Sequence, residues 1–228
     1  MNQIASEDLS AASDDLYRST SIVRVGVLFE ASLVLVALGL GYWLEQPALQ
    51  NLLSATPWEN VLAVGVGLLA TVPMLAALVI IRRLPWGPVQ RLCRLVDEHL
   101  MPLFSDASLI GLLLLSLAAG LGEEVLFRGV LQDWFARWLG GDLGPWAALL
   151  LVSILFGCCH WLNAVYAVFA FLVGLYLGMV YWLSGSLLSA VVAHAAYDFV
   201  ALVWLLRLAA MEAENKKAVV PEDHRFCT

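Results

Sequence analysis

The chain has 228 residues, of which 61% are apolar and only 14% charged, whereas a soluble domain carries about a quarter charged residues. This composition argues against a water-soluble globular protein and makes the lipid bilayer the expected solvent. The formal net charge of −7 comes mostly from the two ends of the chain, so we expect no nucleic-acid partner.

The first half of the sequence contains two apolar runs that are long enough to cross a membrane. A crossing helix needs about 20 mainly apolar residues, and Ile22 to Leu44 and Val61 to Ile81 meet that need. Residues 1–21 precede them as a polar tail. Residues 82–107 mix arginines, acids and prolines, which predicts an interfacial connector with a short amphipathic helix. Residues 22–107 therefore form a unit of two spans and a connector.

The sequence of residues 108–207 predicts a helical core made of the remaining spans. An apolar run starts at Ser108, passes through Gly-Glu-Glu and continues to Leu139, as one long helix that we expect to break near Gly120 or Gly122. The remaining spans are Trp146 to His160, Ala164 to Leu183 and Leu187 to Leu206. The prediction is an all-α, polytopic transmembrane bundle of about six spans, followed by a polar tail over residues 208–228.

The distribution of basic residues predicts the orientation in the membrane. Lysine and arginine occur near both ends and in the connector, whereas the segment from Glu45 to Asn60 has none. Because cytoplasmic loops carry the excess of lysine and arginine, we expect both termini and the connector to face the cytoplasm. The chain is then a multi-pass integral protein, for which the cell membrane is the expected location.

Ionisable side chains inside the predicted spans are candidates for function. Inserting Asp, Lys or Arg at a helix centre costs about 2.5–3.5 kcal/mol on insertion scales. On a helix, Glu124 and Arg128 are four residues apart and can pair, while Glu123 is rotated by about 100° and stays free. The alternative is a buried ion cluster that only holds helices together. Glu30 is a further acidic residue within the first span, expected near an interface.

His160 ends the predicted span Trp146 to His160, at the depth of Glu123 on the preceding helix. From Glu123 to Trp138 is about 22 Å of helix, and from Trp146 to His160 is about 21 Å. On antiparallel neighbours the two side chains therefore reach a similar level. A lone histidine in an apolar helix is more often a hydrogen-bonded structural residue, but a free glutamate at the same depth favours catalysis.

His194 and Asp198 lie four residues apart on one face of the last span, where the carboxylate can orient the imidazole. A hydrogen bond between helices is the structural alternative. Since lipid offers polar groups no partners, we expect the three clusters to meet. A glutamate and histidines can activate water against a carbonyl. Two histidines and a glutamate also match a catalytic zinc site, and although His-Glu-x-x-His is absent, spacing leaves zinc open.

Three short motifs occur in order in the second half of the chain. They are Glu-Glu-x-x-x-Arg at 123–128, Phe-x-x-x-His at 156–160 and His-x-x-x-Asp at 194–198. Together they resemble the CPBP family of intramembrane proteases, which includes the type II CaaX prenyl endopeptidases and abortive-infection and bacteriocin-immunity relatives. The resemblance covers roughly residues 108–207 and has no counterpart in the first half.

The resemblance implies site residues and their roles. It implies that Glu123 and His160 activate water, that His194 and Asp198 bind the oxyanion or shape the site, and that no metal or other cofactor is required. Glu124, Arg128 and Phe156 would support them. The prenyl endopeptidases are expected to have asparagine at the position of Asp198, and this departure weakens the inference of CaaX substrates.

The sequence thus predicts an intramembrane endopeptidase with its active site within the bilayer. Its partner would be a membrane-anchored or lipidated protein or peptide, cleaved in or near the membrane. Two other functions stay open at this stage: a catalytically silent family member that acts in immunity or scaffolding, and an ion-coupled transporter that uses the same buried residues.

Overall fold

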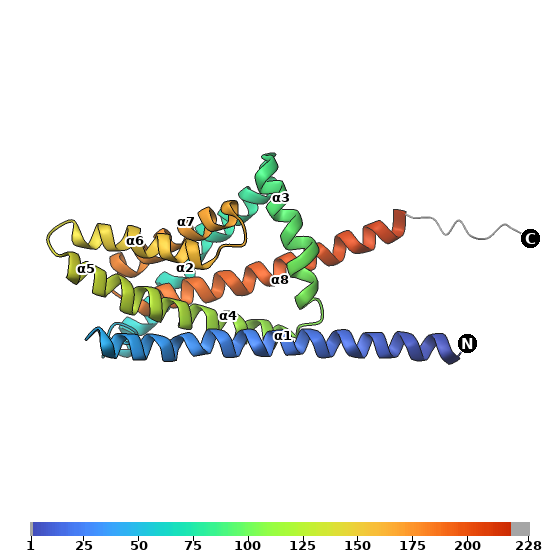
Figure 1. The fold of residues 1–228 in the computed structure, drawn as a ribbon, viewed down its shortest axis with the longest axis horizontal. Helices are drawn as coiled ribbons and strands as arrows, with labels where there is room; N and C mark the ends of the chain where they lie inside the picture. The colour runs from blue at the N-terminus through green and yellow to red at the C-terminus, as the bar shows by residue number, and fades with distance from the viewer. Residues whose placement is uncertain (1, 220–228) are drawn as a thin grey trace, which may run out of the picture.

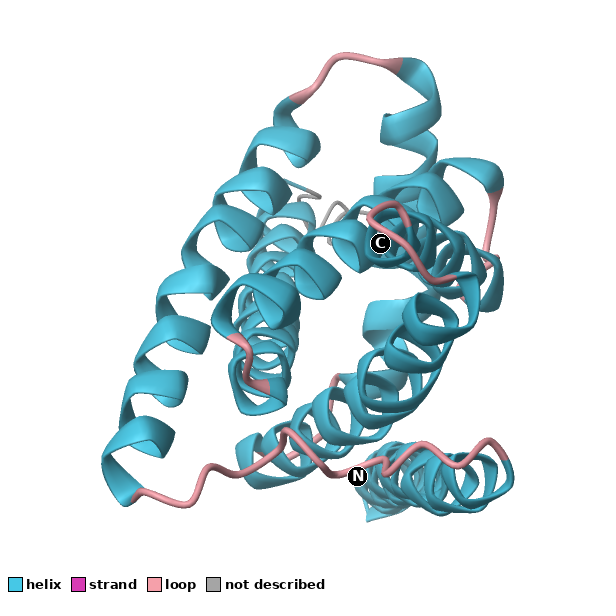
Figure 2. Ribbon diagram, turned by 90° about the vertical axis from the view of Figure 1, so that its left-hand side faces the viewer, coloured by secondary structure: helices cyan, strands magenta, loops and turns pink. Residues whose placement is uncertain are grey.

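A computed structural model describes residues 2–219, with side chains for residues 21–212, 214 and 215. Every regular element in this part of the chain is a helix (Figure 2). The predicted all-α fold is therefore confirmed. The end of the predicted C-terminal tail, residues 220–228, lies outside the described residues, as does residue 1.

Five helical stretches are long and apolar enough to cross a membrane, and they coincide with five of the six predicted spans. They are Ser21–Trp43 within α1 (Asn2–Trp43), Pro57–Arg83 (α2), Leu109–Leu139, Ala164–Ser184 (α7) and Leu187–Glu212 within α8 (Leu187–Val219). α1 begins and α8 ends at the same side of the bundle (Figure 1). The polar residues before Ser21 continue the first helix rather than preceding it.

The sixth predicted span is shorter than a membrane-crossing helix. α6 runs over Gly144–Cys159, and 16 residues cover about 24 Å against a hydrocarbon core of about 30 Å. It follows a turn in which Gly140 and Gly141 have positive φ, begins with Pro145 in its first turn and stops at His160. Figure 1 shows α6 ending part of the way along the bundle. His160 is therefore placed inside the bundle instead of at its far end.

The long helix that carries the Glu-Glu motif is continuous, so the expected break near Gly120 or Gly122 is wrong. α4 (Leu109–Glu124) passes into a π-helical stretch, η3 (Val125–Gln132), and then into α5 (Asp133–Leu139). The two glycines serve close packing instead: a Cβ at Gly120 would lie 2.8 Å from Cβ of Ala195 in α8. The irregularity occurs one turn later, as π-helix, which is frequent at functional sites.

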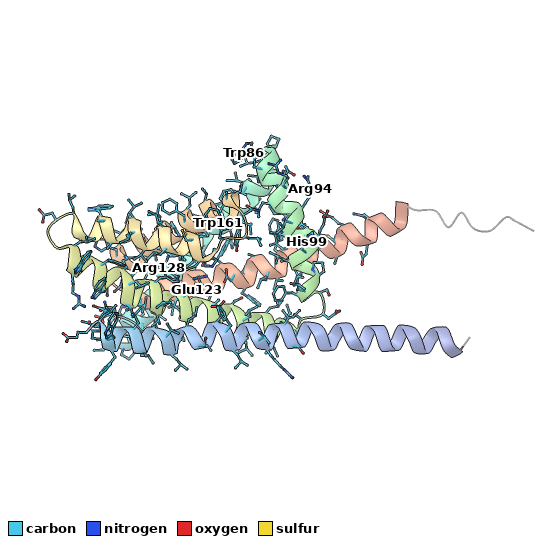
Figure 3. All side chains as sticks on the ribbon, viewed as in Figure 1. Trp86, Arg94, His99, Glu123, Arg128 and Trp161 are labelled. Carbon is cyan, nitrogen blue, oxygen red and sulfur yellow. The ribbon has the colours of Figure 1, made fainter. Side chains whose placement is uncertain are left out.

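The connector crosses the end of the bundle as a chain of short helices. These are α3 (Gly87–Leu95), η1 (Val96–Leu100) and η2 (Met101–Phe104). Val89 and Leu92 are buried, whereas Arg91 and Arg94 are exposed, so α3 is amphipathic as predicted. Figure 3 shows Trp86 and Arg94 on the outside of this segment. The connector lies at the side where α1 begins, roughly perpendicular to the spans (Figure 1).

α8 packs against both α2 and α4, and small residues let the backbones approach closely. A Cβ added at Gly67 of α2 would lie 2.6 Å from the carbonyl oxygen of Ser189 and 2.7 Å from Cβ of Val192. Small residues at helix contacts are typical of membrane bundles. The tight contacts hold α8, and with it His194, at the centre of the fold.

We predict that Gly67→Ala destabilises the protein by about 1–3 kcal/mol, because the methyl group forces α2 away from α8. Gly65→Ala in the same helix is the matched control, since a Cβ there meets nothing within 4 Å. We expect that control to be neutral or to stabilise by up to about 1 kcal/mol through helix propensity. Unfolding in mixed detergent micelles measures both, and equal effects of the two substitutions would contradict the packing argument.

Candidate active site

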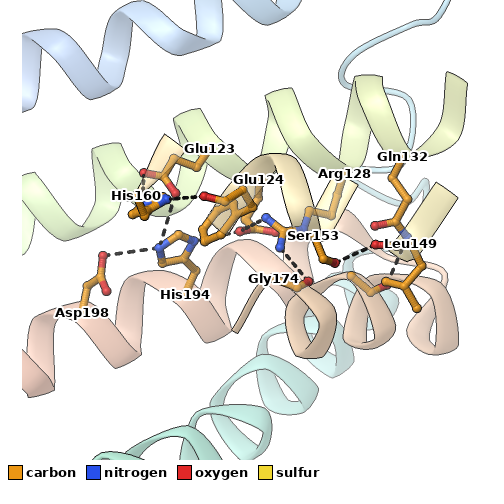
Figure 4. A network of polar contacts seen from close by, with 12 residues as sticks. Glu123, Glu124, Arg128, Gln132, Leu149, Ser153, His160, Gly174, His194 and Asp198 are labelled. Carbon is orange, nitrogen blue, oxygen red and sulfur yellow. Dashed lines mark hydrogen bonds and ion pairs between the residues drawn. The ribbon is translucent and has the colours of Figure 1, made fainter. Parts of the chain in front are cut away.

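The structure brings Glu123, His160, His194 and Asp198 together from three parts of the fold. Glu123 lies near the end of α4, His160 caps α6, and the other two lie on α8 (Figure 4). Glu123 Oε1 is 3.5 Å from Nε2 of His160, and its Oε2 is 3.9 Å from Nε2 of His194. The predicted convergence of these side chains is thus present.

One hydrogen bond determines which nitrogen of the His160 ring is directed at Glu123. Nδ1 of His160 lies 2.8 Å from the carbonyl oxygen of Phe156, one helical turn earlier, so Nδ1–H donates to it. Nε2 is then the nitrogen that faces the carboxylate. A separation of 3.5 Å is long for a direct hydrogen bond, and one water molecule can contact both groups.

Glu124 and Arg128 form a fully buried ion pair beneath this group. Arg128 Nη1 donates to Glu124 Oε1 at 2.9 Å, and the two side chains are 1% and 0% exposed. Arg128 Nη2 also donates to the carbonyl oxygen of Gly174 in α7 at 2.8 Å. The predicted pairing is therefore present, and the arginine ties α4 and η3 to α7.

His194 is held between two carboxyl groups. Its Nδ1 is 2.8 Å from Glu124 Oε1, and its Nε2 is 3.4 Å from Asp198 Oδ2. Only the imidazolium form has an N–H on both ring nitrogens and can donate to both carboxyl groups. The shorter contact fixes the ring through Nδ1, and the longer one leaves Nε2 available to another group near Glu123.

Phe156 packs against both His160 and the buried Arg128. Its ring stacks on His160 with centroids 4.4 Å apart, and the Arg128 guanidinium carbon lies 4.7 Å from its centroid. Phe156 is 2% exposed. A cation over an aromatic ring is attracted by the ring quadrupole, so Phe156 fixes the imidazole on one side and the guanidinium on the other.

The members of the site differ in exposure. The side chains of Glu123 and His194 are 10% and 7% exposed, whereas those of His160 and Asp198 are 26% and 30% exposed. His160 and Asp198 are therefore the members of the site that reach the surface of the bundle. Figure 3 shows Glu123 and Arg128 well inside the bundle.

Within the described residues, no group of three or more His, Cys, Asp or Glu is arranged so that it could hold an ion. His160 Nδ1 is directed at a backbone carbonyl and His194 Nδ1 at Glu124, so Nε2 is the nitrogen that each imidazole turns toward Glu123. Hydrogen bonds from Nδ1 of this kind orient histidines in acid-base sites and in metal sites alike.

Sequence reasoning missed several groups that surround the site. Gly174 and Gly178 supply the carbonyl oxygens that accept from Arg128 at 2.8 Å and from Gln132 at 3.2 Å. Their i,i+4 spacing matches that of the two donors, which was the available signal. Tyr166 lies with its ring centroid 6.4 Å from that of His160.

Comparison with known proteins identifies the segment that contains the site. Residues 105–200 match the family model described as type II CAAX prenyl endopeptidase Rce1-like. The match confirms the resemblance predicted from the three motifs, and at the level of the family it supports a CAAX-type protease of the membrane. No curated protein and no solved structure matches the chain.

We predict that Arg128→Met destabilises the protein by about 3–5 kcal/mol, because it leaves Glu124 buried without its cation. Arg82→Met is the matched control: its bidentate pair with Asp97 is partly exposed and contributes about 0–1 kcal/mol. Unfolding in mixed micelles compares the two variants. A small effect of Arg128→Met, similar to that of the control, would show that the buried pair does not hold the site together.

Proposed function

Because residues 105–200 match the Rce1-like type II CAAX prenyl endopeptidase family, we propose that this chain is an intramembrane endopeptidase that uses a glutamate and a histidine to activate water. The observation that carries the proposal is the 3.5 Å approach of Glu123 Oε1 to His160 Nε2. Both groups can contact one water molecule. One can then act as the general base while the other orients the water.

The first step is attack of water on the peptide carbonyl. Glu123 takes one proton from the water while Nε2 of His160 orients it, and the oxygen adds to the carbonyl carbon. Glu123 then returns the proton to the leaving amine as the C–N bond breaks. His160 holds its place through the bond from Nδ1 to the Phe156 carbonyl. Positioned proton transfer of this kind contributes about 10²–10⁴-fold to the rate.

His194 supplies the positive charge that the tetrahedral intermediate needs. Its Nε2 lies 3.9 Å from Glu123 Oε2 and 3.4 Å from Asp198 Oδ2, so a carbonyl oxygen of the substrate that enters beside Glu123 can accept from Nε2–H. A donor already fixed by Glu124 costs little reorganisation when the oxyanion forms. The oxyanion site is therefore His194, held by the ion pair beneath it.

Asp198 acts through His194 in this scheme. An ionised aspartate has no proton to donate to an oxyanion, so it differs in role from the asparagine expected in the prenyl endopeptidases. At 3.4 Å from Nε2, the carboxylate orients the ring. Asp198 is accordingly a positioning residue.

The substrate class follows from the family and from the depth of the site. The family implies a membrane-associated, prenylated protein in general, and we propose a membrane-anchored or lipidated segment that enters past His160 and Asp198. We further propose that the enzyme works without a metal or other cofactor, in the cell membrane, with both termini cytoplasmic.

We predict that Glu123→Gln and His160→Ala each lower kcat by about 10²–10⁴-fold, because each removes one contact to the attacking water. His99→Ala is the matched control, since His99 is exposed in the connector. The measurement is turnover of fluorogenic membrane peptides by the detergent-purified protein, with and without chelator. Undiminished turnover in both site variants would overturn the mechanism, and chelator inhibition that zinc reverses would favour a metalloprotease.

We predict a graded response at Asp198. Asp198→Asn keeps an acceptor near His194 and retains turnover within about tenfold, whereas Asp198→Ala removes the orienting contact and costs about 10–100-fold. The same peptide assay measures both variants. If alanine and asparagine are equivalent, orientation of His194 by this residue is not required.

A further inference from the structure

The first span contributes an acidic side chain to the site that the proposed mechanism does not use. Glu30 lies on α1, beside Phe29, which is 61% exposed on the outside of the bundle, yet the Glu30 carboxyl oxygen Oε2 is buried. Among the described residues Oε2 has no hydrogen-bond partner. A carboxyl group turned inward in a membrane span without a partner marks a functional site by default.

Backbone packing brings Glu30 next to the proposed general base. Gly122, the residue before Glu123, lies so close to α1 that an added Cβ would clash with the carbonyl oxygen of Glu30 and would lie 3.2 Å from Cβ of Leu33. This contact between α1 and α4 places Glu30 against the residue that precedes Glu123.

The polar groups that meet here contain more acids than cations. Four carboxyl groups face one guanidinium and two imidazoles: Glu30, Glu123, Glu124 and Asp198 against Arg128, His160 and His194. With all of them ionised, one negative charge is left uncompensated. The cations are already engaged, since Arg128 pairs with Glu124 and both imidazoles lie beside Glu123. Glu30 is the acid without a direct partner.

We propose that Glu30 forms a cation-accepting subsite beside Glu123, which receives the ammonium or guanidinium of a lysine or arginine near the cleaved bond of the substrate. The inference rests on the proposed peptidase function and specifies its substrate. Glu123 Oε2, on a residue that is only 8% exposed, is likewise without a hydrogen-bond partner among the described residues. A substrate cation supplies donors to carboxylate oxygens that the fold leaves unpaired.

The subsite has a second consequence for substrate choice. Glu30 and Asp198 flank Glu123 and His194 from different helices, so a carboxylate close to the cleaved bond meets two like charges. Like-charge juxtaposition is an effective means of rejecting a substrate.

The test compares fluorogenic membrane peptides that differ only in one residue, placed in turn within three residues of the cleaved bond as lysine, norleucine or glutamate. At the position that reaches Glu30, we expect kcat/KM for lysine to exceed that for norleucine by roughly tenfold or more, because hydrogen bonds to charged partners are the strong ones. Glu30→Gln removes this preference, and Glu30→Lys reverses it in favour of glutamate. Glu59→Gln, an exposed glutamate of α2, is the matched control and keeps it.

Binding separates this inference from the proposed function. Affinities of the same peptides are measured with His160→Ala and with the double variant His160→Ala, Glu30→Gln. Tighter binding of the lysine peptide only while Glu30 is present supports the subsite, even if no peptide is cleaved by the wild-type protein. Cleavage of all peptides with no lysine preference at any position, in rate or in affinity, overturns the subsite and leaves the peptidase function intact.

Discussion

The bundle depends on one constraint: polar groups at membrane depth have no water to bind and must satisfy one another. The buried pair of Glu124 and Arg128 is the centre of this network. The guanidinium also donates to the Gly174 carbonyl, and the carboxylate also contacts His194. Three spans meet at this pair. Glu123 immediately precedes Glu124 but points in another direction around the helix. It takes no part in the ion pair with Arg128 and lies beside His160 and His194.

Two irregular elements place the reacting groups. The π-helical stretch from Val125 to Gln132 widens the helix just after the paired glutamates, and it carries the arginine and glutamine that reach the α7 carbonyls. The short α6 ends inside the bundle, so His160 caps a helix at the depth of Glu123. A longer α6 would leave His160 at the same depth, which the preceding residues set, but would continue the helix past the site toward the far boundary.

The sequence was sufficient for the fold class, for five of the six spans and for the meeting of three motifs, because apolar length and i,i+4 spacing depend on local chemistry. It was insufficient for the π-helix in place of a break at Gly120 or Gly122, since only the neighbouring helices show that these glycines serve packing. Gly174 as an acceptor for Arg128 depends on α7 lying beside η3, which no local pattern encodes. For the same reason Glu30 could be noticed as an acid within a span but not assigned to the site.

Asp198 and Glu30 each add a carboxyl group to the surroundings of Glu123. Each alone adds negative charge beside a catalytic carboxylate, which in a low dielectric would favour a proton or a cation nearby. His194 meets the charge of Asp198 at 3.4 Å, and its other nitrogen is already engaged with Glu124. No such imidazole is left for Glu30 among the described residues. In our proposal, the charge of the first span is the part of the site that a basic group of the substrate completes.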